Sequence, residues 1–576
     1  MDDSRTHDRA SQNPRLPPAS PDDTPTLPLG ADGWRLPEVQ PTTPSTPTVT
    51  ATATPDAKTI SHSSAGRPPR HGVSRRKLLA GAGAGALGLG LLGSGAAAFL
   101  AHQQSASPAA SASLYTQDAA RIGHLLRRAG FGPSPADLPE YLSLGVSGTL
   151  DRLLNFSHVA NDALDARLKS LNLDFTKRDD LVRWFTLRML YSQRPFEEKL
   201  TLFWHGVLTS GFTKIGSKTR LPYLIQQNQT LRAKGLGRFD DLMRAITVDP
   251  AMLYWLDGRL SSGKSPNENY SREMMELFTM GIGNYTQDDV HQGALALSGW
   301  VVRADGAHFV PSRHYKDSVT FLGHTGPMTV DDVVRIICAH PATGAHLAQR
   351  MWRFFVYDNP SPQDIQPLAD AYYKSDHSIA AMVKAMFSSP AFFSAQAYRA
   401  RVKSPLEFVI GAIRALGLET NTTGLSAVFT ALGQVPLDPP NVAGWPGDGA
   451  SAAWMSTQSW ITRVNFTDLL VAIAAGARPK SAKRINLTSP NGQAAIQRTI
   501  TTQKLASADD VVRYYVAALL DDTLDPSRRA VLSDALTNSP IKGGATYTLA
   551  GGQKISAGAT AEMLYLLMSL PEYQMN

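Results

Sequence analysis

The residue types best suited to chemistry gather in one short segment, 267–281. It contains three glutamates, Glu268, Glu273 and Glu276, and one arginine, Arg272. On an α-helix, where successive residues turn by about 100°, Glu268, Arg272 and Glu276 lie on one face, and Glu273 extends that face. The segment therefore predicts an amphipathic helix that presents three carboxylates and one guanidinium on the same side.

Two kinds of chemistry fit such a face. Three carboxylates could bind a divalent metal cation through their oxygen atoms. Alternatively, Arg272 could keep one glutamate ionised while its neighbours raise the pKa of another, so that the two divide acid and base roles. The same pattern also fits a solvated surface helix, in which Glu268–Arg272 and Arg272–Glu276 are ordinary pairs four residues apart. The pattern alone leaves all three interpretations open.

Two histidines are candidates to assist these carboxylates. His205 follows Phe203 and Trp204 in a predicted helix with few nearby charges. A histidine in such surroundings is more often a core residue than a catalytic one, and both interpretations stay open. His291 follows the aspartates at 288–289, which suit the first turn of a further helix.

The familiar catalytic patterns are missing from this sequence. It contains no GxxxxGK[ST], HExxH or GxSxG motif. The single cysteine, Cys338, lies in an apolar run, so no zinc-type cysteine spacing exists and a buried thiol is predicted.

Helical patterns dominate from Tyr115 onward and supply the elements that must position these side chains. Apolar residues recur at three- and four-residue spacing, and prolines suit several first turns. The predicted helices include 180–194, 195–207, 329–339, 343–356, 404–416, 454–474, 508–520, 526–536 and 559–569. One small β-hairpin is predicted within 299–321, and the polar segment 478–503 is expected to be a loop or arm. The fold class is therefore all-α, with a single large, mostly helical domain over 113–576.

The composition narrows the choice of partners. The chain has 576 residues and a net charge of +7. It shows no dense Lys/Arg stripe interleaved with aromatic residues, so nucleic acid is not the expected partner. A mild positive charge instead favours an anionic polymer of the cell envelope.

The N-terminal part is predicted to be a disordered tail followed by an export signal. Residues 1–73 are rich in Pro, Thr, Ser and Asp, which predicts disorder. Within 74–112, Arg75-Arg76 precede a weakly apolar Ala/Gly/Leu stretch, a pattern typical of a twin-arginine signal. The small residues at 110–112 suit cleavage, and an uncut segment would leave 78–101 as a membrane anchor. A periplasmic, extracellular or cell-surface location is expected.

Several ordered motifs resemble the bacterial "domain of unknown function 1800" (DUF1800) family over nearly all of 115–576. The matching stretches are 124–133, Phe203-Trp204-His205, 267–285, 288–290, 298–300, His314 with 321–323, 439–447 with Trp454, and 569–574. The family often carries a second histidine where this chain has Val207, and an aspartate where it has Tyr315. The resemblance implies one exported, largely helical unit but supplies no reaction. It also suggests as partner an exported sulfatase-like or phosphatase-like protein encoded nearby.

Two functional hypotheses follow. In the first, the chain is an envelope or extracellular hydrolase or lyase in which Glu268, Glu273, Glu276, Arg272 and His205 carry the chemistry, with or without a divalent metal. In the second, it is a non-enzymatic cell-surface binding or scaffold protein that exposes an apolar or aromatic patch, for which the surroundings of Trp445 and Trp454 are one candidate position.

Overall fold

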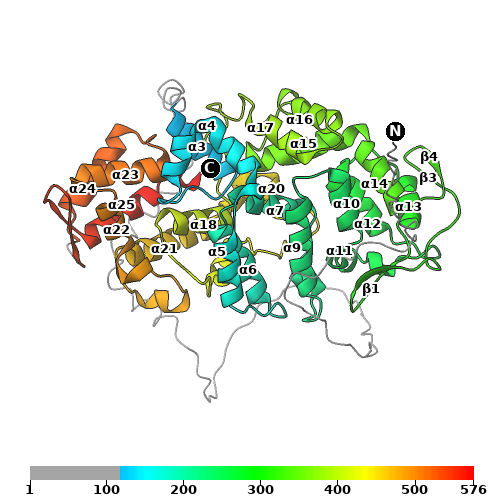
Figure 1. Ribbon diagram of the computed structural model, residues 1–576, viewed down its shortest axis with the longest axis horizontal. Helices are drawn as coiled ribbons and strands as arrows, with labels where there is room; N and C mark the ends of the chain where they lie inside the picture. Colours follow the sequence, from blue (N-terminus) through cyan, green and yellow to red (C-terminus); the bar gives the residue numbers. More distant parts are fainter. Residues whose placement is uncertain (1–116, 542) are drawn as a thin grey trace, which may run out of the picture. The chain divides into compact units, whose positions relative to one another are not determined.

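The computed structural model describes residues 117–541 and 543–576 (Figure 1). The predicted tail, export signal and membrane anchor, all within 1–112, lie outside the described residues. The described part confirms the all-α class: helices carry the fold, and its strands form three two-stranded sheets. Within it, no helix is both long and apolar enough to cross a bilayer.

Most elements of the described residues are helices, and the strands occur as three hairpins among them. The α-helices are α3 (Asp118–Arg128), α4 (Leu138–Leu154), α5 (Asp162–Ser170), α6 (Arg178–Tyr191), α7 (Pro195–Val207), α8 (Phe212–Ile215), α9 (Pro222–Lys234), α10 (Phe239–Thr247), α11 (Pro250–Trp255), α12 (Glu268–Glu273), α13 (Gln287–Ala296), α14 (Val330–Ala339), α15 (Pro341–Phe355), α16 (Pro362–Lys374), α17 (Ile379–Phe387), α18 (Pro405–Ala415), α19 (Leu425–Leu432), α20 (Pro446–Gly449), α21 (Thr457–Ala474), α22 (Ala495–Thr502), α23 (Ala508–Leu520), α24 (Pro526–Asn538), α25 (Ala557–Met568) and α26 (Pro571–Gln574). The remaining elements are the 3₁₀ turns η3 (Phe156–His158), η4 (Gly258–Leu260), η6 (Ser451–Trp454), η7 (Lys480–Arg484) and η8 (Pro490–Gly492), the π-helical turn η5 (Met274–Thr279), and the strands β1 (Trp300–Arg303), β2 (Gly306–Phe309), β3 (Val319–Phe321), β4 (His324–Gly326), β5 (Thr546–Thr548) and β6 (Lys554–Ser556).

Helix ends follow the local capping chemistry. Pro195 lies in the first turn of α7, where its missing N–H costs nothing. Ser507 caps α23 and exchanges hydrogen bonds with Asp510. Both helices have the predicted bounds. The expected loop 478–503 is wrong in its last part, because α22 buries Ile496 and Ile500, one turn apart, on one face.

The predicted hairpin is present, but it is one of three among the described residues. Strands β1 and β2 pair antiparallel across the turn at Asp305-Gly306. Residues 319–321 are not part of it: they form β3, which pairs with β4 in a second hairpin. Strands β5 and β6 form a third. The strands of these two hairpins have three residues each, too few for an alternating pattern to stand out.

Buried charges tie the central helices together. In α7, the fully buried Glu198 accepts hydrogen bonds from Arg188 of α6, at 3.0 Å, and from Arg232 of α9, at 2.7 Å. The next residue, Lys199, is also fully buried and donates to Glu407 of α18. Burial alone would raise the pKa of Glu407, but Lys199 and other cations hold it at about 2.

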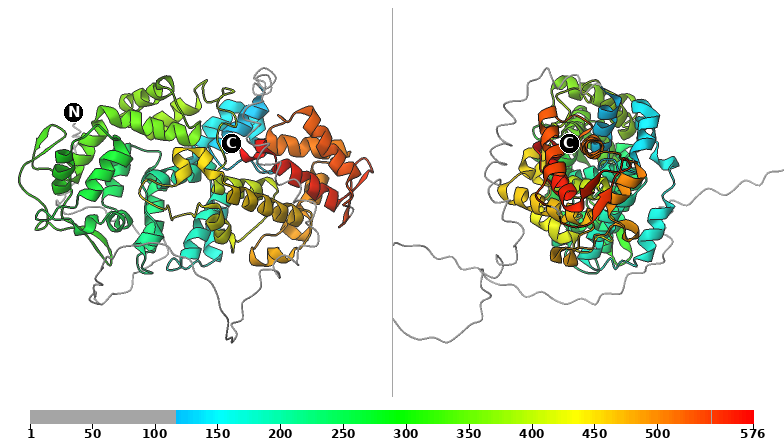
Figure 2. Two further views of the ribbon diagram at one scale, coloured as in Figure 1. Left: turned by 180° about the vertical axis from the view of Figure 1, so that it is seen from behind. Right: turned by 90° about the vertical axis from the view of Figure 1, so that its left-hand side faces the viewer.

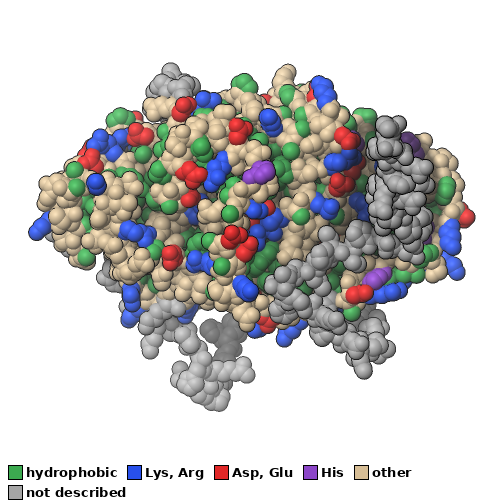
Figure 3. Space-filling model, viewed as in Figure 1, with side chains coloured by type: hydrophobic (Ala, Val, Ile, Leu, Met, Phe, Trp, Pro, Cys, Tyr) green, Lys and Arg blue, Asp and Glu red, His purple; other side chains and the backbone are tan. Residues whose placement is uncertain are grey.

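Helices that follow one another in the chain also pack side by side in two groups. Helices α15, α16 and α17 pack in series, and α23 to α25 pack together near the C-terminal segment, as both views show (Figures 1 and 2). On the face shown in Figure 3, acidic and basic side chains are interspersed rather than separated by sign. Cys338 is buried, as predicted.

The ion pair between Lys199 and Glu407 gives a stability prediction. Glu407→Gln keeps the size of the side chain but leaves the Lys199 ammonium buried without its counter-charge. We expect the free energy of unfolding to fall by about 3–5 kcal/mol, measured by urea denaturation. Glu419→Gln, at an exposed position, should change it by less than about 0.5 kcal/mol. A loss at Glu407 no larger than at Glu419 would show that the buried pair does not hold these helices.

Candidate functional site

The acidic segment 267–281 is not one regular helix. Asn267 caps α12 by accepting a hydrogen bond from the Asn269 N–H at 2.9 Å. From Met274 onward the chain forms the π-helical turn η5, and the Met280 N–H donates to the Met275 carbonyl at 2.9 Å, five residues back. The prediction of a single α-helix is therefore wrong for the second half. π-Helical turns of this kind are rare and occur frequently at functional sites.

The π turn separates side chains that a regular helix would align. The pair Glu268–Arg272 forms as predicted, at 3.4 Å. The predicted pair Arg272–Glu276 is wrong: Arg272 donates to Gln287 at 2.9 Å, and Glu276 accepts from the Tyr285 hydroxyl at 2.7 Å. The reason is that residues in a π turn rotate by less than 100° per step, so Glu276 does not return to the side of Arg272.

Glu268 organises the outer part of the site. Its carboxylate accepts from Gln287 Nε2 at 2.9 Å and contacts His291 Nδ1 at 3.1 Å. Both partners lie on α13, which starts at a Thr286–Asp289 capping box. His291 therefore joins the acidic segment through Glu268, and the two side chains are 46% and 35% exposed.

Glu273 differs from its neighbours. Its side chain is half-buried, and among the described residues it has no hydrogen-bond or ion-pair partner. Burial and then the Glu276 carboxylate raise its pKa, and Arg272 opposes them only in part. Burial and the bond to Glu276 also raise the pKa of Tyr285 to about 12, so this hydroxyl stays protonated near neutral pH. An unpartnered carboxyl group thus lies near a carboxylate–tyrosine pair.

Helix α15 holds the π turn from the other side. His346 Nε2 lies 3.3 Å from the Leu277 carbonyl, and Arg350 donates to the same oxygen at 3.4 Å. Arg350 also donates to the Gly206 carbonyl of α7 at 3.4 Å. Gly281, which ends the turn, has φ +81° and lies so close to His346 that a Cβ would be 2.8 Å from its Nδ1.

His205 lies apart from the glutamates. It is 1% exposed, packs against Trp445 with ring centroids 5.6 Å apart, and neither ring nitrogen has a hydrogen-bond partner among the described residues. Burial lowers its pKa to about 4. Its backbone neighbour Gly206 is joined to the π turn through Arg350. The geometry therefore favours the core interpretation of His205.

The carboxylates do not form a ligand set for a metal. Throughout 117–541 and 543–576, no group of three His, Cys, Asp or Glu side chains is placed to hold an ion. Glu268, Glu273 and Glu276 have different surroundings because the π turn spreads them. The acid–base interpretation is the one that this geometry favours.

The sequence missed three residues of the site. Tyr285 lies at the end of the family-like segment 267–285, so that resemblance could have suggested it. His346 and Arg350 lie about 70 residues further along the chain, and nothing in their local pattern separates them from other helix positions.

Together these features define a large helical protein with an acidic site on a π-helical turn. The family model "Protein of unknown function (DUF1800)" matches residues 124–575, and the chain therefore belongs to this family. No curated protein and no solved structure matches the chain.

The burial of His205 predicts how stability depends on pH. Its pKa is about 4 in the folded protein and about 6.5 when unfolded. The stabilisation from burying the neutral imidazole is complete above pH 6.5 and is lost as the pH falls toward 4. The free energy of unfolding should therefore fall by about 2 kcal/mol between pH 7 and 5. His205→Leu removes no hydrogen bond and should reduce this fall by about the same amount, measured by urea denaturation at both pH values.

The exposed His324 supplies the control. His324→Leu should leave the pH dependence as in the wild type, and the other buried histidines contribute equally to every protein compared. Parallel wild-type and His205→Leu curves would show that His205 titrates normally and is accessible to solvent.

Proposed function

We propose that this protein is an exported hydrolase or lyase in which Glu273 transfers a proton to or from the substrate. The observation that carries this proposal is the state of Glu273, a half-buried carboxyl group with a raised pKa and no described partner on a π-helical turn. A raised pKa lets a carboxyl group keep its proton at a higher pH than an ordinary glutamate, which suits general acid–base catalysis.

The neighbouring groups have distinct roles in this proposal. Glu276 accepts a hydrogen bond from the Tyr285 hydroxyl at 2.7 Å, and its carboxylate helps to raise the pKa of Glu273. Arg272 is held by Glu268 and Gln287. Its guanidinium is 37% exposed and would bind an anionic group of the substrate. An anionic envelope polymer has such groups along its length.

Export and partnership are further parts of the proposal. The Arg75-Arg76 pair ahead of an Ala/Gly/Leu stretch supports export by the twin-arginine route. Acid–base chemistry of this kind is compatible with an exported sulfatase-like or phosphatase-like partner acting on the same polymer, a pairing suggested by the family resemblance alone.

The scaffold hypothesis loses one candidate position for its binding surface. It expected an exposed apolar or aromatic patch, and the suggested position around Trp445 and Trp454 is wrong. The two side chains are only 2% and 4% exposed, because they pack into the core beside α7 and α20. We therefore favour the enzyme hypothesis.

The proposal predicts the effect of one isosteric change. Glu273→Gln should lower turnover by about 10²–10⁴-fold, since it removes the transferable proton, and leave the free energy of unfolding within about 0.5 kcal/mol of wild type. The full-length protein is incubated with a panel of anionic and neutral envelope polysaccharides and with peptidoglycan. Released fragments are quantified by mass spectrometry.

Glu419→Gln is the matched control and should retain wild-type turnover. Tyr285→Phe should slow turnover less than Glu273→Gln, since it leaves the Glu273 carboxyl group in place. Equal release by the wild type and Glu273→Gln, or no release by the wild type from any polymer, contradicts the proposal.

A further inference from the structure

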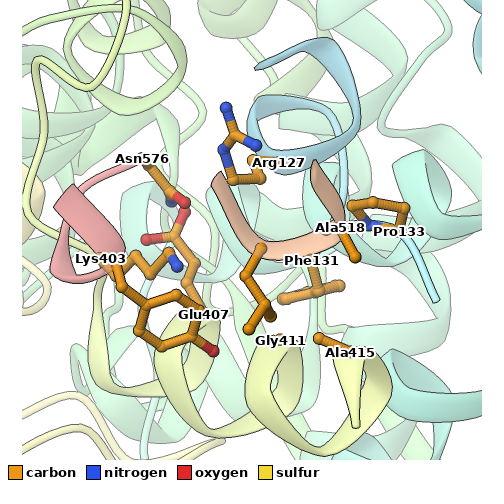
Figure 4. Close-up of a pocket in the computed structure, with 12 residues that line it drawn as sticks. Arg127, Phe131, Pro133, Lys403, Glu407, Gly411, Ala415, Ala518 and Asn576 are labelled. Carbon is orange, nitrogen blue, oxygen red and sulfur yellow. The ribbon is translucent and has the colours of Figure 1, made fainter. Parts of the chain in front are cut away.

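Cavities of very different size occur in the described part of the chain. Lys403 and Glu407 line one of about 20 Å³ beside the C-terminal residue Asn576, shown with its lining in Figure 4. It has room for about one water-sized group, and the end of the chain already lies there. A second pocket, between α8, the end of α11 and the loop 438–442, has a volume of about 340 Å³. This volume is in the range of small-molecule sites.

The larger pocket has mostly apolar walls. Its apolar side chains are Trp255, Leu256, Pro439, Pro440 and Val442. Four polar side chains also line it, and two of them, Lys214 and Asp438, carry a charge. Apolar walls with a small number of polar groups are typical of ligand sites, in which the polar groups fix the orientation of the ligand.

The backbone holds Asp438 in a fixed position in this lining. The preceding residue, the buried Leu437, has φ +63°, a left-handed conformation that is uncommon for a bulky side chain. Its carbonyl accepts a hydrogen bond from the Phe212 N–H at 3.2 Å. The Thr213 N–H and hydroxyl donate to the two carboxylate oxygens of Asp438, at 2.8 and 2.6 Å. These contacts fix the carboxylate relative to α8.

Asp438 keeps acceptor positions that its own neighbours do not use. Its side chain is half-buried, and no cation of the described residues forms an ion pair with it. Burial raises the pKa of Asp438, and the bonds from Thr213 and the attraction of Arg178 offset this only in part. An ionised carboxylate has about four acceptor positions. Thr213 occupies one on each oxygen, so each oxygen can accept a further bond.

The cation in the lining already has other partners. Lys214 donates to the Trp255 carbonyl and lies 3.7 Å from the Asp257 carboxylate, which is outside the lining. The charge of Lys214 is therefore balanced on the side of α11, and that of Asp438 is not. The partner that Asp438 lacks is a donor with a positive charge.

We propose that this pocket binds a small primary amine, whose ammonium group bonds Asp438 and whose apolar body lies against Pro440 and Val442. A hydrogen bond between an ammonium and a carboxylate is about twice as strong as one between neutral groups. Walls that exclude water strengthen it further, because the local dielectric constant is lower. No lining residue belongs to the acidic segment 267–281, so this proposal does not depend on the role of Glu273.

Three probes with the same phenyl body test the proposal on the full-length protein: phenethylamine, phenethyl alcohol and hydrocinnamate, which are cationic, neutral and anionic. Binding is measured by saturation-transfer difference NMR titration. Phenethylamine should bind saturably, and the other two should bind about tenfold more weakly or less, because neither forms a charge-assisted bond with Asp438.

Asp438→Asn removes the charge but keeps an oxygen that can accept from Thr213. It should lower the affinity for phenethylamine by about tenfold or more and leave that for phenethyl alcohol unchanged. Asp534→Asn, at an exposed position of α24, is the matched control and should bind all three probes as the wild type does.

Val442→Trp supplies a second variant, which keeps the Asp438 carboxylate but fills the pocket. The Val442 carbonyl, which accepts from the Thr209 hydroxyl at 2.9 Å, stays in place. This variant should lose the binding of phenethylamine while urea denaturation shows a folded protein. Equal binding of phenethylamine to the wild type and Asp438→Asn would overturn the proposal. So would a wild type that binds phenethyl alcohol or hydrocinnamate as tightly as phenethylamine, or that shows no saturable binding of the amine.

Discussion

Two consecutive residues of α7, Glu198 and Lys199, bury opposite charges, and the arrangement of the helices depends on them. Glu198 binds arginines of α6 and α9, and Lys199 binds Glu407 of α18. Because adjacent residues on a helix point in different directions, one helix is fixed on two sides at once. Moving any partner would leave a charge unpaired in the interior, which costs several kcal/mol, so these contacts specify where the helices lie.

The buried charges of α7 are connected to the acidic site through hydrogen bonds to two backbone carbonyls. Helix α7 offers the Gly206 carbonyl, and Arg350 of α15 joins it to the Leu277 carbonyl of the π turn. The π turn in turn sets Glu273 apart from the paired Glu268, Arg272 and Glu276. A regular helix would have placed Glu276 beside Arg272 and drawn it into an ion pair. The buried ionic centre thus supports a site whose reactive group is left without a partner.

Local patterns in the sequence predicted the helical class and many boundaries well. Helices α7 and α23 were placed to the residue because Pro195 and the Ser507–Asp510 capping box act within one turn. The acidic segment was identified as the site, but its geometry was not, because projecting residues at 100° assumes an unbroken α-helix. No local signal reports a switch to i→i+5 hydrogen bonding at Met274.

Contacts between residues distant in sequence could not be predicted from local patterns, for a different reason. Whether Arg350 touches the π turn, or whether the ring nitrogens of His205 find partners, depends on packing between helices distant in sequence. The cluster of buried cations around Glu407 has the same origin. Its members come from four separate stretches of sequence, and each one alone looks like an ordinary surface lysine or arginine: Arg127 and Arg128, Lys199, Arg401 and Lys403, and Arg463.

The central claim is that Glu273 is a carboxyl group whose proton is held more tightly than usual. Infrared difference spectroscopy between the wild type and Glu273→Gln, recorded across a pH titration, isolates the C=O stretch of this one protonated carboxyl group. Asp249 and Asp448, whose pKa values burial raises to about 7 and about 6, titrate in both proteins and cancel. The account predicts a band that disappears with a midpoint above the ordinary value of 4.5. A midpoint at or below that value, or no difference band at all, would contradict it.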